Sequence, residues 1–98
     1  MLYGGLGDLQ LTNAVHEAEK AILRYLIAHR DARDTIEGIE RWWLPRSKEY
    51  GITAVAEALQ RLKGRDLIRV WKSASAKPVY GLRSYDLESL REHLRGLE

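Results

Sequence analysis

The sequence contains no cysteine among its 98 residues. Without a thiol it can form no disulfide, thiolate zinc site, iron–sulfur cluster or cysteine nucleophile. No apolar run approaches the ~20 residues that a membrane span needs. Residues 1–11 also lack the basic segment and apolar stretch of a signal peptide. These absences predict a cytoplasmic protein that has no membrane contact.

Residues that could carry catalysis or bind a metal are present, but their spacing is unsuitable. His16, His29 and His93 each lack a second ligand four residues away, which a zinc pair on one helix requires. No Gly-x-Ser-x-Gly nucleophile motif occurs. Asp31 and Asp34 flank an expected loop and make no convincing carboxylate pair. We therefore expect no enzymatic activity, no catalytic residue, no cofactor and no metal.

Positive charge is concentrated in the centre of the chain. Residues 46–83 carry nine Lys/Arg and three Asp/Glu, a net charge of +6, whereas residues 1–45 and 84–98 each carry −2. Such a basic block is typical of a site for a polyanion, most often nucleic acid. A solvated basic face without a partner is the alternative.

The N-terminal part of the chain predicts an arm followed by a helix. Residues 1–11 contain three glycines and no helical periodicity, which favours a flexible arm. A first helix is expected from near Asn13, a good N-cap, to about His29, because apolar residues recur there at helical spacing. A polar loop follows at residues 30–33.

Two further helices are expected before the basic block ends. In the first of these two helices, the Asp34 side chain should cap the backbone amide three residues later. The Glu37 side chain should reach back to the backbone amide of Asp34, as in a capping box. Pro45 should end that helix. The next helix should run from about Thr53 to Lys63, with Gly64 as its stop. Its inner seam consists of Val55, Ala58, Leu59 and Leu62.

The apolar period changes from 3.6 to 2 at Leu67, which predicts a hairpin. The strands should cover residues 67–71 and 78–82, with a small polar tip at residues 72–77. A last helix should follow at residues 84–98, capped by Asp86. Its leucine seam consists of Leu87, Leu90, Leu94 and Leu97.

This order of elements resembles the winged helix-turn-helix domain of bacterial and archaeal regulators. The resemblance covers about residues 13–83, and its most similar stretch is Gly64-Arg65-Asp66-Leu67-Ile68-Arg69, at the end of a recognition helix and the start of a wing. It implies an α+β winged-helix fold over residues 12–83. It also implies a transcription regulator that binds double-stranded DNA.

A narrower resemblance covers about a third of the chain. The hairpin at residues 67–82, with Trp71, a serine-containing tip and the ending Tyr80-Gly81-Leu82, is similar to the wing of the small D protein family associated with dissimilatory sulfite reductase. That family has a winged-helix fold and is linked to DNA binding or to its reductase partner. This resemblance implies an alternative function, an accessory subunit that docks on an enzyme such as a sulfite reductase.

The winged-helix interpretation places the helix at residues 53–63 in the major groove and the wing beside it. Arg61 suits guanine and Gln60 suits adenine, while Thr53 at the helix N-terminus suits a phosphate. Ser73 and Ser75 are small donors at the wing tip. Phosphates should also be neutralised by Arg46, Lys48, Arg69, Lys72 and Lys77.

Two features favour the protein-binding alternative. Glu57 lies in the middle of the proposed recognition face, where it would repel phosphates. Trp42 and Trp43 are adjacent, so they cannot both point inward from one helix. Trp43 continues the apolar seam and should be core. Trp42 should be partly exposed, either packed on the wing or arm or in contact with a partner.

The leucine seam of the last helix must be buried against something, because so short a helix is not stable alone. One option is the first helix of the same chain, whose outer positions include Leu23 and Ile27. The other is the same helix of a second chain in a two-fold dimer. We expect a homodimer in which the last helix also packs partly on its own domain, with Leu90 and Leu94 at the contact.

Overall fold

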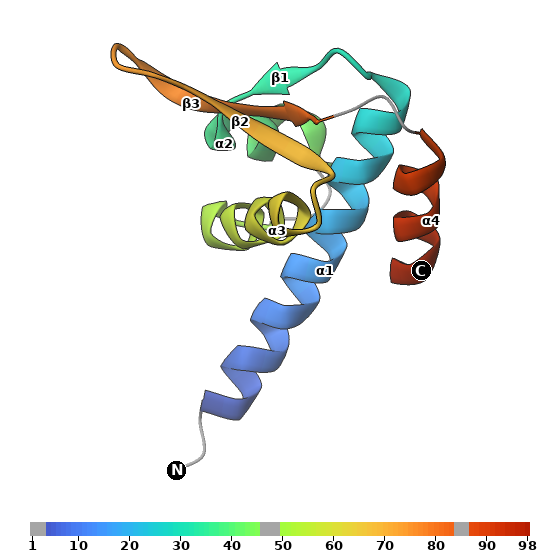
Figure 1. Ribbon diagram of the computed structural model, residues 1–98. Helices are drawn as coiled ribbons and strands as arrows, with labels where there is room; N and C mark the ends of the chain where they lie inside the picture. The colour runs from blue at the N-terminus through green and yellow to red at the C-terminus, as the bar shows by residue number, and fades with distance from the viewer. Residues whose placement is uncertain (1–3, 46–49, 84–86) are drawn as a thin grey trace.

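The computed structural model describes residues 4–45, 50–83 and 87–98. Over these residues the chain has an α+β fold that combines helices with a three-stranded antiparallel sheet (Figure 1), which confirms the predicted class. The helices are α1 (Gly4–Ala28), α2 (Ile36–Gly38) with its π-helical continuation η1 (Ile39–Trp43), α3 (Ile52–Gly64) and α4 (Leu87–Leu97). The strands are β1 (Arg33–Asp34), β2 (Ile68–Ser73) and β3 (Ala76–Leu82). None of these described helices is long and apolar enough to cross a bilayer.

The inner face of the sheet belongs to the core. In the β2–β3 hairpin, Ile68 pairs with Leu82 and Val70 pairs with Tyr80. Because side chains alternate along a strand, these four residues share one face. Ile68, Tyr80 and Leu82 are buried and Val70 is half-buried against the same core.

The core itself forms where α1, α3 and the sheet meet. Ile22 and Leu26 of α1 are fully buried, and the predicted seam of α3 is buried along its whole length. Trp43 is only 7% exposed and stacks on Tyr25 of α1, at 4.7 Å between ring centroids. The expectation that Trp43 is core and that Trp42 is exposed is therefore confirmed.

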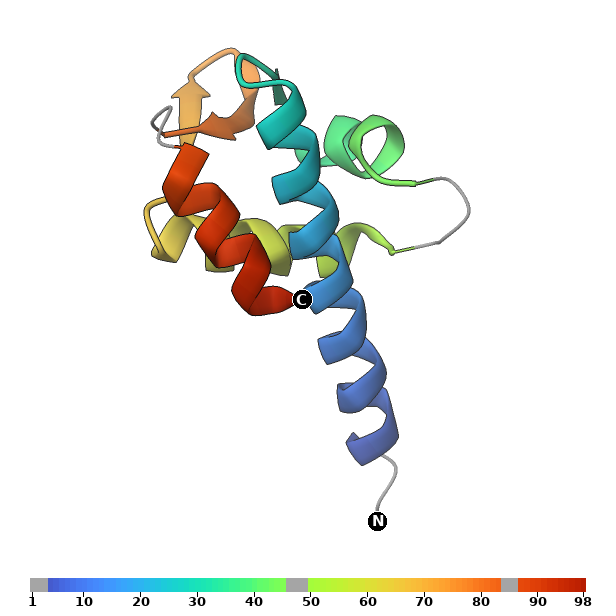
Figure 2. The ribbon, with the colours of Figure 1, turned by 90° about the vertical axis from the view of Figure 1, so that its right-hand side faces the viewer.

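Helix α4 packs along α1 of its own chain (Figure 2). Leu90 is 2% exposed, and the other seam leucines of α4 are half-buried against the same core. At the end of α4, Nε2 of His16 donates to the carbonyl oxygen of Leu97 at 2.6 Å, and Arg24 pairs with Glu98. Within its own chain the leucine seam therefore packs on α1, as in the first of the two options, and the homodimer stays a prediction.

The first helix begins earlier than predicted. It starts at Gly4 and contains Asn13, which we expected to cap it, and its N-terminal turns extend beyond the rest of the domain (Figure 2). A helix that is already formed gains one hydrogen bond for each residue it adds, whereas each glycine costs only about 1 kcal/mol relative to alanine. The glycines near the N-terminus therefore do not prevent a helix, and the prediction of a flexible arm is wrong from Gly4 onward.

The second helix is capped one residue later than the sequence predicts. Thr35, and not Asp34, is the N-cap, because Oγ1 of Thr35 accepts a hydrogen bond from the amide of Gly38 at 3.1 Å. Residues 33–34, which we expected in or beside a loop, form strand β1 on the edge of β3. Asp34 is thus a strand residue, and its Oδ1 accepts from the Thr35 amide at 2.8 Å.

The hairpin tip is shorter than predicted. The strands end at Ser73 and begin again at Ala76, so only residues 74–75 form the turn. Lys72, Ser73 and Lys77 consequently lie in strands. Period-2 alternation marks a strand only while its faces differ in polarity, and both faces of this end of the hairpin are exposed.

Candidate nucleic-acid interface

The outward face of α3 carries two of the predicted DNA contacts, Thr53 and Gln60, with the exposed Glu57 between them. Thr53 and Gln60 are both exposed and lie seven residues apart, so they follow one line along the helix. Thr53 is in the first turn, where free backbone amides attract an anion. Gln60 presents an amide that can both donate to and accept from an adenine edge. These two predicted contacts therefore share one accessible surface.

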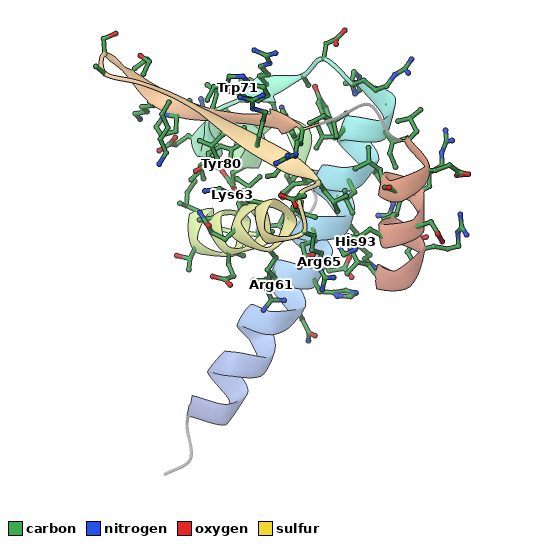
Figure 3. All side chains as sticks on the ribbon, in the orientation of Figure 1. Arg61, Lys63, Arg65, Trp71, Tyr80 and His93 are labelled. Carbon is green, nitrogen blue, oxygen red and sulfur yellow. The ribbon has the colours of Figure 1, made fainter. Side chains whose placement is uncertain are left out.

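Arg61 is turned away from this line and lies between two carboxylates. Its NH1 atom is 3.6 Å from Oε1 of Glu19 on α1, and its Nε atom is 3.7 Å from Oε2 of Glu57. Figure 3 shows Arg61 on the side of α3 that is nearest α1. Arg61 must exchange these partners for a base before it can read guanine. Glu57, which we expected to repel phosphates, also neutralises Arg61.

Glu19 connects three helices and was not singled out from the sequence. Its side chain is 3% exposed, and its Oε2 atom lies 3.6 Å from Nε2 of His93 on α4. That distance suits an ion pair but is too long for a hydrogen bond, and Nε2 of His93 is buried with no hydrogen-bond partner among the described residues. The sequence carried one signal: Glu19 falls between Val15 and Leu23 on an apolar line.

The wing cations differ in how they are paired. Arg69 and Lys72 are exposed, and neither forms an ion pair with any carboxylate in the described part of the chain. Nζ of Lys77, in contrast, lies 3.7 Å from Oε2 of Glu37 on α2. Arg69 and Lys72 are therefore the more available phosphate contacts.

The two serines at the tip contact each other. The backbone amide of Ser75 donates to Oγ of Ser73 at 3.2 Å, and both residues are exposed. The Ser73 hydroxyl keeps its own proton for a further acceptor. Ser73 thus shapes the turn and still presents one donor at the end of the wing.

A cation–aromatic cluster covers the outer face of the sheet. Cζ of Arg33 lies 3.9 Å from the ring centroid of Trp71, and Cζ of Arg69 lies 4.9 Å from the same centroid. We call these three residues the Arg–Trp cluster. Arg33 was missed because its place beside Trp71 depends on the pairing of β1 with β3, which no local pattern indicates.

Two more cations near the C-terminal end of α3 were not singled out. Lys63 is exposed, has no ion pair among the described residues and lies on the side of α3 that faces the sheet (Figure 3). Arg65 lines a cleft together with Glu88 and Glu92 of α4. Both belong to the basic block and could have been named from it.

An exposed apolar pair lies beside the start of α3. Trp42 is 61% exposed and Ile52 is 45% exposed. Both line one cleft, whose other walls include Glu37 and Glu40 of the neighbouring helical segments. The predicted partner contact Trp42 is thus part of a small apolar surface with carboxylates beside it.

The remaining predicted residues fall elsewhere. Leu90 and Leu94 of the proposed dimer contact are packed against the core of their own chain. The predicted phosphate contacts Arg46 and Lys48 lie outside the described residues. Within the described ranges, no group of three or more His, Asp or Glu side chains is arranged to hold a metal ion.

Comparisons with family models, with curated proteins and with solved structures find no match for this chain.

Proposed function

We propose that this chain is a winged-helix regulator that binds double-stranded DNA, with α3 in the major groove and the β2–β3 hairpin as the wing. The order α1, β1, α2, α3, β2, β3 supports the proposal, because a helical pair followed by a hairpin resembles the winged-helix arrangement. So does the placement of β1 on the free edge of β3, which anchors the hairpin to the helices. The domain acts by occupying a site on DNA and performs no chemistry.

The observation that carries the proposal is a set of exposed cations around α3 and the hairpin that have no carboxylate partner in the described chain. Lys63, Arg69 and Lys72 are such residues. Unpaired cations raise the positive potential around them, and each phosphate that they neutralise releases counterions from DNA. This electrostatic attraction draws a duplex to the domain irrespective of the DNA sequence.

Sequence discrimination in this proposal depends on α3. Thr53 positions the helix on a phosphate, and Gln60 reads an adenine edge about two turns further along the same line. Arg61 contributes only at DNA sites whose contacts with it compensate for the loss of its ion pairs with Glu19 and Glu57. Glu57 lies between Thr53 and Gln60 and repels phosphates. Helix α3 therefore gives modest specificity, and most of the affinity comes from the wing and Lys63.

Binding of a fluorescent duplex to the full chain, measured by anisotropy over a range of salt concentrations, tests the proposal. Lys72→Ala should reduce the salt slope by about one phosphate contact. Arg91→Ala on the exposed face of α4 removes the same charge away from the interface and should leave the slope unchanged. Absence of binding to random and genomic duplexes at ~50 mM salt would reject DNA binding.

A second candidate function, protein docking, is favoured by Trp42 and Ile52. Their cleft is also lined by the carboxylates of Glu37 and Glu40 and by Arg41, two acidic groups against one basic group. This lining favours a peptide segment that carries one large apolar residue flanked by lysines or arginines. Peptides with a single Trp anchor between lysines should bind better than the same peptides with glutamates. Trp42→Ala should weaken binding by about 10-fold or more. Equal affinity for both peptide sets would reject this candidate.

A further inference from the structure

The Arg–Trp cluster lies on a different surface from the reading face of α3. In the sheet register, Arg33 and Arg69 both pair with Gly81, one from each side. Side chains of paired residues point to the same face, and Trp71 follows Arg69 by two residues on that face. Figure 3 shows Trp71 on the side of the sheet that points away from α3.

Gly81 forms the floor of this cluster. A Cβ atom at this position would meet the carbonyl oxygen of Ala32 at 2.8 Å, the Cγ atom of Arg33 at 3.0 Å and the Trp71 ring at 3.1 Å. The absence of a side chain therefore lets β1 approach β3 and lets the indole lie low on the sheet. Trp71 is half-buried as a result, and its ring is a fixed surface for the two guanidinium groups.

The chemistry of the cluster suits an anion. Two like charges lie close to one indole ring, and neither arginine forms an ion pair with a carboxylate among the described residues. A guanidinium that stacks on an aromatic ring keeps its in-plane N–H donors free for a planar or tetrahedral oxyanion. Arg61 and Arg83, by comparison, direct donors at carboxylates of the chain itself.

We propose that Arg33 and Arg69, positioned by Trp71, bind a phosphodiester of a nucleic-acid backbone on the outer face of the sheet. This inference rests on the proposed function and adds a contact from β1 that is outside the wing and α3. The cluster lies on an open face of the sheet, where a free phosphate ion would meet few groups besides the two arginines. A polymer gains affinity there, because the adjoining hairpin, with its exposed Lys72, can hold a neighbouring phosphate of the same strand.

The test measures anisotropy of a labelled duplex with the full chain and with Arg33→Gln, which keeps the stem that packs on Trp71. We expect binding to weaken by about 5–10-fold and the salt slope to fall by about one. Arg30→Gln, an exposed arginine in the adjoining turn, is the matched control and should change affinity by less than about 2-fold through long-range charge alone. Trp71→Leu keeps both cations but removes the ring, and should weaken binding by a similar factor to Arg33→Gln.

A titration followed by NMR distinguishes the source of the phosphate. The indole N–H resonance that disappears in Trp71→Leu should shift on addition of the duplex, and only weakly on addition of inorganic phosphate. If the wild-type chain binds the duplex, and Arg33→Gln reduces its affinity no more than Arg30→Gln does, the cluster is not a contact and the proposed function stands. If inorganic phosphate saturates the shift and the duplex does not compete, the site belongs to a free phosphate. If the wild-type chain binds no nucleic acid, both proposals are overturned.

Discussion

The outward face of α3 and the outer face of the sheet hold arginines in opposite ways. On α3, Arg61 lies between Glu19 and Glu57, so its charge is already compensated. On the sheet, Arg33 and Arg69 stack on Trp71 and have no carboxylate partner in the described chain. The same residue type is therefore a structural link on one surface and an available charge on the other.

This difference shows how far a count of charges can be read as a binding surface. Residues 46–83 have a net charge of +6, yet three cations in that block pair with carboxylates of the chain itself. An arginine from outside the block, Arg33, joins the available set through the pairing of β1. The number of basic residues indicates the class of partner, whereas the fold decides which of them can meet it.

The largest expected effect is on stability, and it compares the glycine beneath the Arg–Trp cluster, Gly81, with the glycine at the end of α3, Gly64. Gly81→Ala should destabilise the domain by about 2–3 kcal/mol, because the new Cβ would press on the Ala32 carbonyl oxygen at 2.8 Å and force β1 away. Gly64→Ala at the end of α3 meets nothing within 4 Å and should be neutral or stabilising by up to about 1 kcal/mol. Urea denaturation of both variants gives the comparison. Equal midpoints would show that β1 does not depend on the close approach at Gly81.

The sequence predicted most of the fold because its helices and hairpin each bury one regular face. The seam of α3, the opposite orientations of Trp42 and Trp43, and the switch to period 2 after Leu67 all depend on neighbours a few residues away. Strand β1 was missed because two residues are too short for a periodic signal. Its existence depends on Gly81, some fifty positions later in the chain.

The candidate site was predictable only in part for the same reason. Exposure of Thr53 and Gln60 followed from helical spacing, but the pairing of Arg61 with Glu19 requires α1 and α3 to cross at that point. Lys77 and Glu37 likewise meet only after the hairpin folds over α2. Ion pairs between distant segments leave no local pattern, so availability of a charge is the property that sequence analysis captures least.

The second prediction concerns the two carboxylates that pair with Arg61, each of which is neutralised in turn. Glu19→Gln should cost about 1–2 kcal/mol of stability, because Glu19 is buried and contacts both Arg61 and His93. Glu57→Gln removes the exposed partner and should change stability by less than about 0.5 kcal/mol. Thermal or urea unfolding measures both. If Glu57→Gln proved the more destabilising, Arg61 would depend on the exposed carboxylate for its position.

The third prediction compares a compensated cation with an available one in DNA binding. Lys72→Ala removes a charge without a described partner and should lower the salt slope by about one. Arg61→Ala removes a charge that two carboxylates already offset, so the slope should fall by less than half as much on a non-specific duplex. Anisotropy titrations at several salt concentrations provide both slopes. A larger effect of Arg61→Ala would mean that the duplex displaces Glu19 and Glu57 even without a specific base.

The smallest effect concerns Lys77, which combines features of both surfaces, since it lies on the hairpin but pairs with Glu37. Both side chains of this pair are mostly exposed, at 72% and 60%, so the ion pair should contribute less than about 0.5 kcal/mol to stability. Glu37→Gln should therefore leave the unfolding midpoint nearly unchanged while it frees Lys77 for a phosphate. The salt slope of duplex binding should then rise by up to about one, with affinity increased by about 2-fold at low salt. A slope that stays at the wild-type value would show that Lys77 does not reach the backbone, which would restrict the wing contact to Arg69 and Lys72.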